Sequence, residues 1–550
     1  MDRIATLMDR RTGSTSNMFG GIGYRVIVAV IAIIAAAPIA VAALSIFEDT
    51  GDVWAHLARY VLPVALTNTL WLVVGVAGIA GTIGVALAWL VAVYQFPGRR
   101  FFSWALLLPM AMPGYVLAFA FAAIFDYTGG IQTLWREALG NPFAFPDIGA
   151  RAASILTLSL VLYPYVFLVV REAFASQGVR TLEVAQSCGL RRWQGFLRVS
   201  LPMARPFIAA GVGLAVMESL ADFGTVKLYN YTTFTTAIYQ SWYGLFSLEA
   251  ALQMSLVLLA VVFVALFLEH RLRGNSQFTA SGHCAEDRRI VLTGRAALGA
   301  TLLCAGVFLI AFVMPASLIT GWSIRSFASE FDSRYWQFAL NTLALAATSS
   351  AIVTAVAVML SFSVRREGGT MNTLLARIAT LGYAIPGTVL AVGFFVPVAA
   401  LSRLINDQFM ADGATSIALQ GGLAVVLLAY LSRFLAVAHS PVDSALLRIR
   451  PSIEDASRGM GVGGLPMLRQ IHLPILRPAI LTAALLVFVD VMKELPITLM
   501  TRPFGWDTLA VRVFQLTTEG EWERAALPAL AIVLTGLIPV MLLTRHRHNA

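Results

Sequence analysis

The sequence predicts an all-α transmembrane protein of about twelve helices, built as two tandem six-helix domains. Three observations predict this class: the composition, a series of long apolar runs and an internal repeat. Of the 550 residues, 58% are hydrophobic and 13% are charged, and the mean hydropathy is +0.77. Soluble chains carry about 25% charged residues, so the composition excludes an ordinary soluble domain.

The apolar runs are long enough to cross a bilayer, which takes roughly 20 helical residues. We expect spans at residues 24–47, 64–94, 102–125, 153–171, 206–226, 250–269, 295–321, 337–363, 373–401, 421–440, 479–499 and 525–544. The first 23 residues are polar and include RRTGSTSN. Because the first apolar run is long, we expect a cytoplasmic tail and a retained helix, and not a cleaved signal peptide.

Arginine placement predicts the orientation of these spans. In a twelve-span count the arginine-rich segments fall on one side, which the positive-inside rule makes cytoplasmic together with both termini. They contain Arg10, Arg11, Arg25, Arg99, Arg100, Arg191, Arg192, Arg271, Arg273, Arg288, Arg289, Arg365, Arg366 and the tail RHRHN. The net charge of +9 therefore reflects topology and does not indicate nucleic-acid binding. The scattered Cys188, Cys284 and Cys304 indicate neither a disulfide framework nor a metal site.

An internal repeat divides the chain into halves. NTLWLVV at Asn68 returns as NTLALAA at Asn341, and PGYVLAF at Pro113 returns as PGTVLAV at Pro386, each pair 273 residues apart. A constant separation indicates duplication. With six spans each, the two halves insert the same way up, which predicts a pseudo-two-fold axis along the membrane normal. We expect a tail at 1–23, domains at 24–272 and 294–550, and a polar, flexible linker at 273–293.

The repeated Pro-Gly pairs interrupt apolar runs. Proline frees a carbonyl and bends a helix, so we expect helix kinks at Pro113 and Gly114 and at Pro386 and Gly387. Ordinary packing kinks are the alternative, because membrane helices tolerate both residues. The matched positions favour a shared architectural role.

A polar, arginine-rich segment also occurs twice, 272 residues apart. The copies are LEVAQSCGLRRWQGFLRVSLPMARPFI at 182–208 and EDASRGMGVGGLPMLRQIHLPILRPAI at 454–480. Each predicts a short helix, a turn and a second short helix. We expect positive φ at Gly189 and Gly461, and a helix boundary at Pro202 and Pro474.

In the first copy an apolar stripe recurs at helical spacing beside arginines, at Trp193, Phe196, Leu197 and Leu201. Such an amphipathic helix suits insertion into a partner's groove. It suits equally a helix lying on lipid headgroups. Periodicity does not separate these two interpretations.

The two segments resemble the EAA motif of bacterial ABC importer permeases, as LEVAQSCG…SLP and EDASRGMG…HLP. The first copy departs at Leu182 and Val184, where the motif has an acid and an alanine. The resemblance covers nearly the whole chain and implies two fused MetI-like permease domains in a bacterial inner membrane. It implies that a first loop (172–205) and a second loop (441–477) dock on two ATPase subunits, and that a periplasmic solute-binding protein delivers the cargo. The residues implied in coupling are Glu183, Ala185, Gly189, Trp193, Leu201, Pro202, Glu454, Asp455, Ala456, Gly461, Leu473 and Pro474.

Motifs of catalysis are missing from the sequence. Its two lysines, Lys227 and Lys493, do not follow glycine, so no P-loop is possible, and no H-E-x-x-H, C-x-x-C or G-x-S-x-G occurs. We therefore expect no cofactor in this chain, with ATP and Mg bound by the partner ATPase. A secondary transporter and a membrane enzyme are the alternatives from other classes. The doubled loop argues against the first, and the missing reactive residues argue against the second.

Two stretches bear on the cargo. ESLADFGTVKLYNYTTFTTAIYQSWYG at 218–244 and DVMKELPITLMTRPFGWDTLAVRVFQLTTEGEWERAA at 490–526 resemble fused ferric-iron permeases, the partners of periplasmic ferric-binding proteins. Related permeases serve thiamine, and similar ones phosphorylated sugars, so these cargoes remain alternatives.

Two acidic pairs in these stretches are candidate pathway residues. Glu218 with Asp222, and Asp490 with Glu494, have the i,i+4 spacing of one helix face. Carboxylates at membrane depth usually face a cavity or a partner, and hard oxygen ligands suit a hard cation. Contacts with neighbouring loops or with the binding protein are the alternative, favoured for Asp222 and Glu494. No metal ligand is firmly assigned. The nearby Tyr229, Tyr231, Tyr239 and Tyr243 could be iron ligands, although an interfacial aromatic belt explains them more simply.

Overall fold

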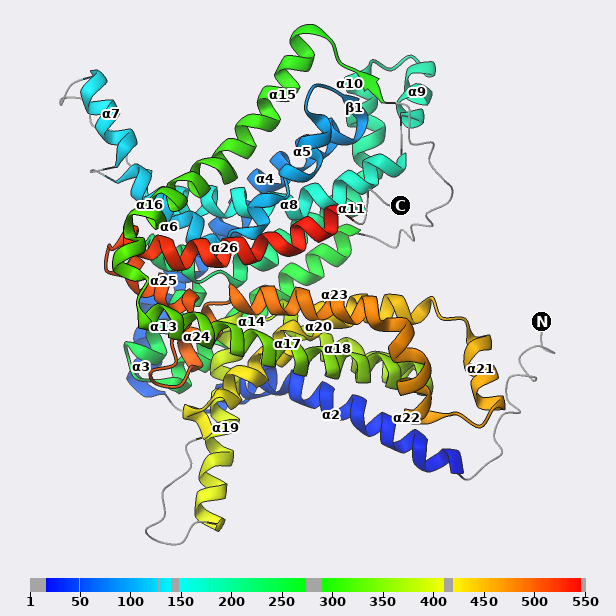
Figure 1. Cartoon of the computed structure of the whole chain (residues 1–550). Helices are drawn as coiled ribbons and strands as arrows, with labels where there is room; N and C mark the ends of the chain where they lie inside the picture. Colours follow the sequence, from blue (N-terminus) through cyan, green and yellow to red (C-terminus); the bar gives the residue numbers. More distant parts are fainter. Residues whose placement is uncertain are drawn as a thin grey trace. The chain divides into compact units, whose positions relative to one another are not determined.

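The computed structural model describes residues 16–545 except 49, 127–128, 140–147, 178, 274–288 and 410–418. These residues form an almost wholly helical protein, which confirms the predicted fold class (Figure 1). Eleven of the described helices are long and apolar enough to cross a membrane, and one bent pair brings the number to twelve. Most of the predicted tail and linker lie outside the described residues.

The helices and the single strand of the first half follow in chain order. They are α2 (Ser16–Leu44), η1 (Ser45–Phe47), α3 (Gly51–His56), η2 (Leu57–Val61), α4 (Leu62–Val93), β1 (Tyr94–Gln95), α5 (Arg99–Ala105), η3 (Leu108–Ala111), α6 (Gly114–Phe125), α7 (Gly130–Leu139), α8 (Ala150–Gln177), α9 (Arg180–Ser187), α10 (Arg192–Gly195), η4 (Phe196–Ser200), α11 (Leu201–Ala221), α12 (Gly224–Leu228), α13 (Phe234–Tyr243) and α14 (Leu248–Arg273).

The second half repeats this succession with its own boundaries. Its elements are β2 (Ile290–Val291), α15 (Gly294–Phe308), η5 (Leu309–Val313), α16 (Met314–Glu330), α17 (Ser333–Glu367), α18 (Thr370–Thr380), η6 (Leu381–Ala384), α19 (Gly387–Phe409), η7 (Leu419–Gly421), α20 (Leu423–Leu447), α21 (Pro451–Gly459), α22 (Gly464–Met467), η8 (Leu468–His472), α23 (Leu473–Met492), α24 (Pro496–Thr501), α25 (Leu509–Thr518) and α26 (Trp522–Arg545).

Two segments expected to be irregular are partly ordered. Helix α2 begins at Ser16, within the predicted tail of 1–23. The apolar part of that helix does begin at Gly23, which is what the hydropathy pattern detected. At the far end of the linker, β2 pairs in parallel with β1, with Tyr94 opposite Ile290.

Contacts divide the described chain into two compact units that do not follow the halves of the sequence. Unit 1 takes its described residues from 1–40, 346–383 and 427–491, and unit 2 takes them from 41–345, 384–426 and 492–550. Within unit 1, α17 packs against two other long helices. Ser361 Oγ lies 2.8 Å from His439 Nδ1 of α20, and Phe362 meets the ring of Tyr24 in α2 edge-on.

Each five-residue π-helical segment among the described residues ends two positions before a proline. The segments η2, η4, η5 and η8 precede Pro63, Pro202, Pro315 and Pro474. A proline ring clashes with the carbonyl four residues earlier, and a wider π turn relieves that clash. The prediction of a helix boundary at Pro202 and Pro474 is therefore wrong, because each helix continues through its proline, as Arg192–Ala221 and Gly464–Met492.

The Pro113-Gly114 pair separates two helices instead of kinking one. The axes of Arg99–Ala111 and Gly114–Phe125 differ by 92°. Pro113 has extended ψ and stands before the first turn of α6, where its missing N–H removes no bond. In the second half, α19 likewise begins at Gly387, directly after Pro386.

The repeated Asn-Thr dipeptides make the same contacts in both halves, within unit 2. The Asn68 side chain donates to the Thr232 carbonyl at 2.9 Å, and the Asn341 side chain donates to the Asp507 carbonyl at 3.1 Å. The threonine that follows each asparagine accepts a hydrogen bond from a backbone N–H. Thr69 accepts from the Phe234 N–H, and Thr342 accepts from the Leu509 N–H. The dipeptides therefore hold the starts of α13 and α25.

Small residues bring three helices of unit 2 close together. A Cβ added to Gly84 of α4 would lie 2.6 Å from Val166 Cβ of α8, and one added to Gly211 of α11 would lie 2.8 Å from Val166 Cα. Glycine is what allows such backbone approach between membrane helices.

We predict that Gly211→Ala lowers the free energy of unfolding by about 1–3 kcal/mol, because the backbone of α8 must move to admit the methyl group. Gly78→Ala on α4 is the matched control. Its added Cβ meets nothing within 4 Å, so it should stabilise the helix by about 0.5–1 kcal/mol. Unfolding of the purified protein in detergent measures both changes. Equal effects at the two positions would contradict the close contact.

Candidate functional site

Each repeated loop turns on a glycine with the geometry that the sequence predicts. Gly189 has φ of +82° and Gly461 has φ of +80°, so positive φ is confirmed at both positions. In the first loop, the Leu190 N–H donates to the Ala185 carbonyl at 3.1 Å and the Gly189 N–H donates to the Gln186 carbonyl at 2.9 Å. This pair of bonds is a Schellman motif, which satisfies the last carbonyls of α9.

The second loop repeats the motif bond for bond. The Val462 N–H donates to the Ser457 carbonyl at 2.9 Å, and the Gly461 N–H donates to the Arg458 carbonyl at 3.0 Å. The Ser457 hydroxyl adds a bond to the Val462 carbonyl at 2.7 Å. Two helix ends in one chain thus have the same backbone conformation and the same hydrogen bonds.

The first loop buries one face and exposes the other. Leu182 and Ala185 of α9 are buried, and a Cβ added to Gly195 of α10 would lie 3.3 Å and 3.2 Å from their side chains. The small Ala185 therefore permits the two short helices to pack. Glu183 and Trp193 point outward, and Trp193 is 61% exposed.

The predicted apolar stripe of the first loop is split by this packing. Trp193 and Leu197 are exposed, whereas Phe196 packs against Trp89 of α4 with the ring centroids 4.5 Å apart. Leu201 is half-buried. The stripe is divided because the helix widens into the π turn η4 at Phe196, which breaks the regular spacing assumed for it.

The second loop exposes equivalent positions. Asp455 and Ala456 are exposed, and Leu465 is 61% exposed at the position that matches Trp193. Leu473 is half-buried, and Pro474 is exposed, as Pro202 is in the first loop. Both loops thus expose a large apolar side chain at the same position of the repeat.

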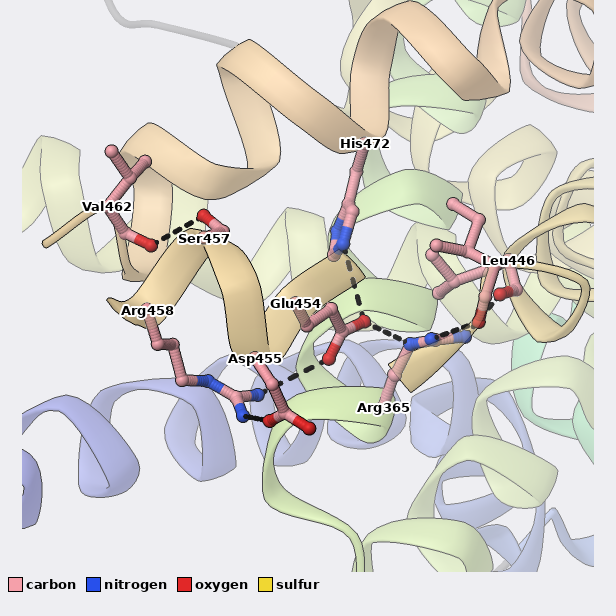
Figure 2. A network of polar contacts seen from close by, with 9 residues as sticks. Arg365, Leu446, Glu454, Asp455, Ser457, Arg458, Val462 and His472 are labelled. Atoms are coloured by element: carbon pink, nitrogen blue, oxygen red, sulfur yellow. Dashed lines mark hydrogen bonds and ion pairs between the residues drawn. The ribbon is translucent and has the colours of Figure 1, made fainter. Parts of the chain in front are cut away.

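Glu454 of the second loop lies in an ionic network within unit 1 (Figure 2). Arg365 Nε, from the last turn of α17, lies 2.6 Å from Glu454 Oε1. Arg458 bridges Glu454 at 3.3 Å and Asp455 at 2.9 Å. The buried His472 places Nε2 3.3 Å from Glu454 Oε1.

The two acids that end the predicted i,i+4 pairs cap short helices. Asp222 follows the last residue of α11 with extended ψ, and its Oδ2 accepts from the Val226 N–H at 3.2 Å in α12. The Thr225 hydroxyl donates to Oδ1 at 2.9 Å. A Cβ added to Gly114 would lie 3.1 Å from that same oxygen.

Glu494 makes the equivalent contacts in the second half. It is buried, and its two carboxylate oxygens accept from the backbone N–H groups of Ile497 and Thr498 in α24, at 2.8 and 3.1 Å. A Cβ added to Gly387 would lie 3.1 Å from its Oε1. Each Pro-Gly break therefore has its glycine where a capping carboxylate approaches.

The expectation that each acidic pair shares a helix face is wrong. Helices α11 and α23 end at Ala221 and Met492, before the second acid of each pair. The chain turns there because the carboxylate satisfies the N–H groups of the next short helix. The first acids, Glu218 and Asp490, remain on α11 and α23 and are half-buried. Roles in the pathway or in docking stay predictions for all four.

The neighbouring tyrosine hydroxyls bond to backbone carbonyls of unit 2. Tyr229, Tyr231 and Tyr243 donate to the carbonyls of Ala118, Asn68 and Met500 at 3.1, 3.0 and 2.6 Å. Tyr239 stacks on Tyr243 with ring centroids 5.1 Å apart. These contacts give each of the four tyrosines a partner within unit 2.

Sequence reasoning missed the contacts or positions of three residues in or beside the second loop. Arg365 and His472 were not linked to Glu454, and Leu465 was not matched to Trp193. The repeat itself carried a signal for Leu465, because the offset of 272 residues places it opposite Trp193. Nothing in the sequence pairs Arg365 with a residue 89 positions away.

Residues 80–274 match the family model described as binding-protein-dependent transport system inner membrane component. This part of the chain therefore carries a domain of that family. The permease is 27% identical over 490 residues to a Fe(3+)-transport system permease protein of Haemophilus influenzae, covering 88% of this chain and 89% of the relative. The family match and this relative confirm the resemblance to binding-protein-dependent permeases.

Other relatives match a smaller part of the permease. A sulfate transport system permease protein of Escherichia coli is 31% identical over 146 residues, which is 26% of this chain and 51% of that relative. A putative 2-aminoethylphosphonate transport system permease protein of Salmonella typhimurium is 26% identical over 268 residues. The match covers 46% of this chain and 94% of that relative. The solved structure of a bacterial alginate ABC transporter, in complex with an alginate pentasaccharide-bound periplasmic protein, covers 44% of this chain and 91% of its own at a TM-score of 0.35 and 16% identity.

We predict that Gly461→Ala destabilises the turn of the second loop by about 1–2 kcal/mol, because an L-residue with a Cβ is strained in the left-handed region. Gly459→Ala is the matched control, two residues away. Neither added Cβ meets an atom within 4 Å, so only φ distinguishes the two positions. Transport and cargo-stimulated ATP hydrolysis by the reconstituted complex should fall for Gly461→Ala alone. Wild-type activity in both variants would remove the turn from the coupling mechanism.

Proposed function

We propose that this permease is the membrane subunit of an ATP-driven importer that receives ferric iron from a periplasmic binding protein and releases it into the cytoplasm. The observation that supports ferric iron as the cargo is similarity over both halves of the chain. The Fe(3+)-transport relative aligns with 88% of this chain and 89% of its own length, whereas the 2-aminoethylphosphonate relative aligns over 94% of its own length with 46% of this chain.

The loops support the coupling half of the proposal. Both turn on a glycine at φ near +80°, and both expose a large apolar residue at the same position, Trp193 or Leu465. A partner with a groove covers such helices. Two equivalent loops in one chain call for two ATPase subunits, which would hold the ATP and Mg. The cytoplasmic placement of both termini belongs to the same proposal, because it puts both loops on the ATPase side.

The remaining acids support the cargo half. Glu218 and Asp490 lie on membrane helices and are half-buried at equivalent places of the repeat. Carboxylates are costly at such depth and are the ligand type that a hard trivalent cation prefers. Glu218 and Asp490, each within its own half, are therefore the candidates for transient contacts with iron.

Deletion of this chain from its host should abolish high-affinity accumulation of ⁵⁵Fe(III), and re-expression should restore it. Uptake of ³⁵S-sulfate and growth on 2-aminoethylphosphonate or thiamine should be unchanged. A co-encoded ATPase carrying a disabled nucleotide site should give the same loss of iron uptake. If iron uptake persists while another of these cargoes is lost, ferric iron is the wrong cargo and the permease function stands. Iron uptake that needs no ATPase would point instead to a secondary transporter.

A further inference from the structure

The second loop is tied to the membrane helices by one arginine. Besides its 2.6 Å contact with Glu454, the Arg365 guanidinium donates to the carbonyls of Leu446 and Ile449, the latter at 2.7 Å. These carbonyls belong to the end of α20 and the residues just after it, where a helix leaves acceptors unpaired. Arg365 therefore joins α17, α20 and α21 through a single side chain (Figure 2).

Glu454 extends this connection to a fourth segment. His472 of η8 approaches Glu454 Oε1, the oxygen that also faces Arg365. The imidazole is buried, and the ring of Phe362 from α17 packs edge-on against it with centroids 5.4 Å apart. The Glu454 side chain is only 13% exposed, so its charge interactions are screened less than those of a surface pair.

The first loop has none of these charges at the matching positions. The loop repeat places Leu182 opposite Glu454 and Ser200 opposite His472, and the Asn68–Asn341 spacing places Ala92 opposite Arg365. Leu182 and Ser200 are both 2% exposed. Arg365, Glu454 and His472 are therefore replaced together by uncharged residues, and α9 is held by apolar packing against Gly195.

We propose that the ion pair of Arg365 with Glu454, with His472 packed beside it, forms a latch that fixes the second loop to α17, and that the first loop lacks this latch, so the two loops respond differently to their ATPase subunits. The part of this inference that concerns ATPase subunits rests on the proposed function. The latch itself rests on contacts within unit 1.

The physical consequence differs for partial and complete removal. Removing the Glu454 charge leaves the Arg365 guanidinium with carbonyl acceptors alone, which destabilises the loop, whereas replacing a whole buried ionic group by apolar residues is often neutral. The first loop is a natural example of the complete replacement. The variant Arg365→Ala/Glu454→Leu/His472→Ser transfers that solution to the second loop.

Hydrogen exchange of the whole chain in lipid nanodiscs tests the latch without any partner. Glu454→Gln should raise exchange of the amides at 451–459 about tenfold, the effect of losing one charge-assisted bond, and leave 180–187 unchanged. Glu367→Gln is the matched control, because Glu367 is also 13% exposed, lies on α17 and pairs with Arg25 outside the loop. The triple variant should return exchange at 451–459 close to the wild-type rate. Equal exchange in Glu454→Gln and Glu367→Gln would overturn the latch.

The assembled importer tests the inequivalence of the loops. For Glu454→Gln, cargo transported per ATP hydrolysed should be roughly halved, because one of two loops is loosened, and the triple variant should recover most of it. Glu367→Gln should match wild type. An unchanged ratio in Glu454→Gln, together with raised exchange, would leave the latch without a coupling role and overturn the inequivalence. Failure of the proposed function would show differently, as absent ATPase subunits or absent uptake in the wild type.

Discussion

A backbone N–H or carbonyl freed by a helix break inside a membrane protein must find its partner within the protein. At the breaks after α11 and α23, two carboxylates meet this constraint. Asp222 and Glu494 accept hydrogen bonds from backbone N–H groups of the short helices that follow, α12 and α24. A Cβ at Gly114 or Gly387 would lie 3.1 Å from these carboxylates, so glycine lets α6 and α19 begin without displacing them.

Duplication applied the same solutions twice, and the differences between copies are informative. The Asn-Thr contacts, the carboxylate caps and the Schellman turns occur in both halves with nearly the same distances. The two loops are anchored differently, because the second loop is held by charged residues and the first loop by apolar packing. Features that satisfy the backbone are thus shared, whereas features that set how firmly a loop is held have diverged.

Much of this architecture could be predicted from the sequence, because hydropathy and the repeat report length, number and order of helices directly. The positive φ at Gly189 and Gly461 followed from residue type alone. The ends of α11 and α23 could not be predicted, since an acid that continues a helix and one that caps the next helix have the same spacing. The contact of Arg365 with Glu454 depends on packing between α17 and α21, which local pattern does not encode.

The central claim is that one chain supplies the entire membrane pathway and both coupling loops. Native mass measurement of the complex extracted in detergent tests this most directly. The account predicts one copy of this 59.3 kDa chain with two ATPase subunits. Two copies of the chain for each pair of ATPase subunits would contradict it.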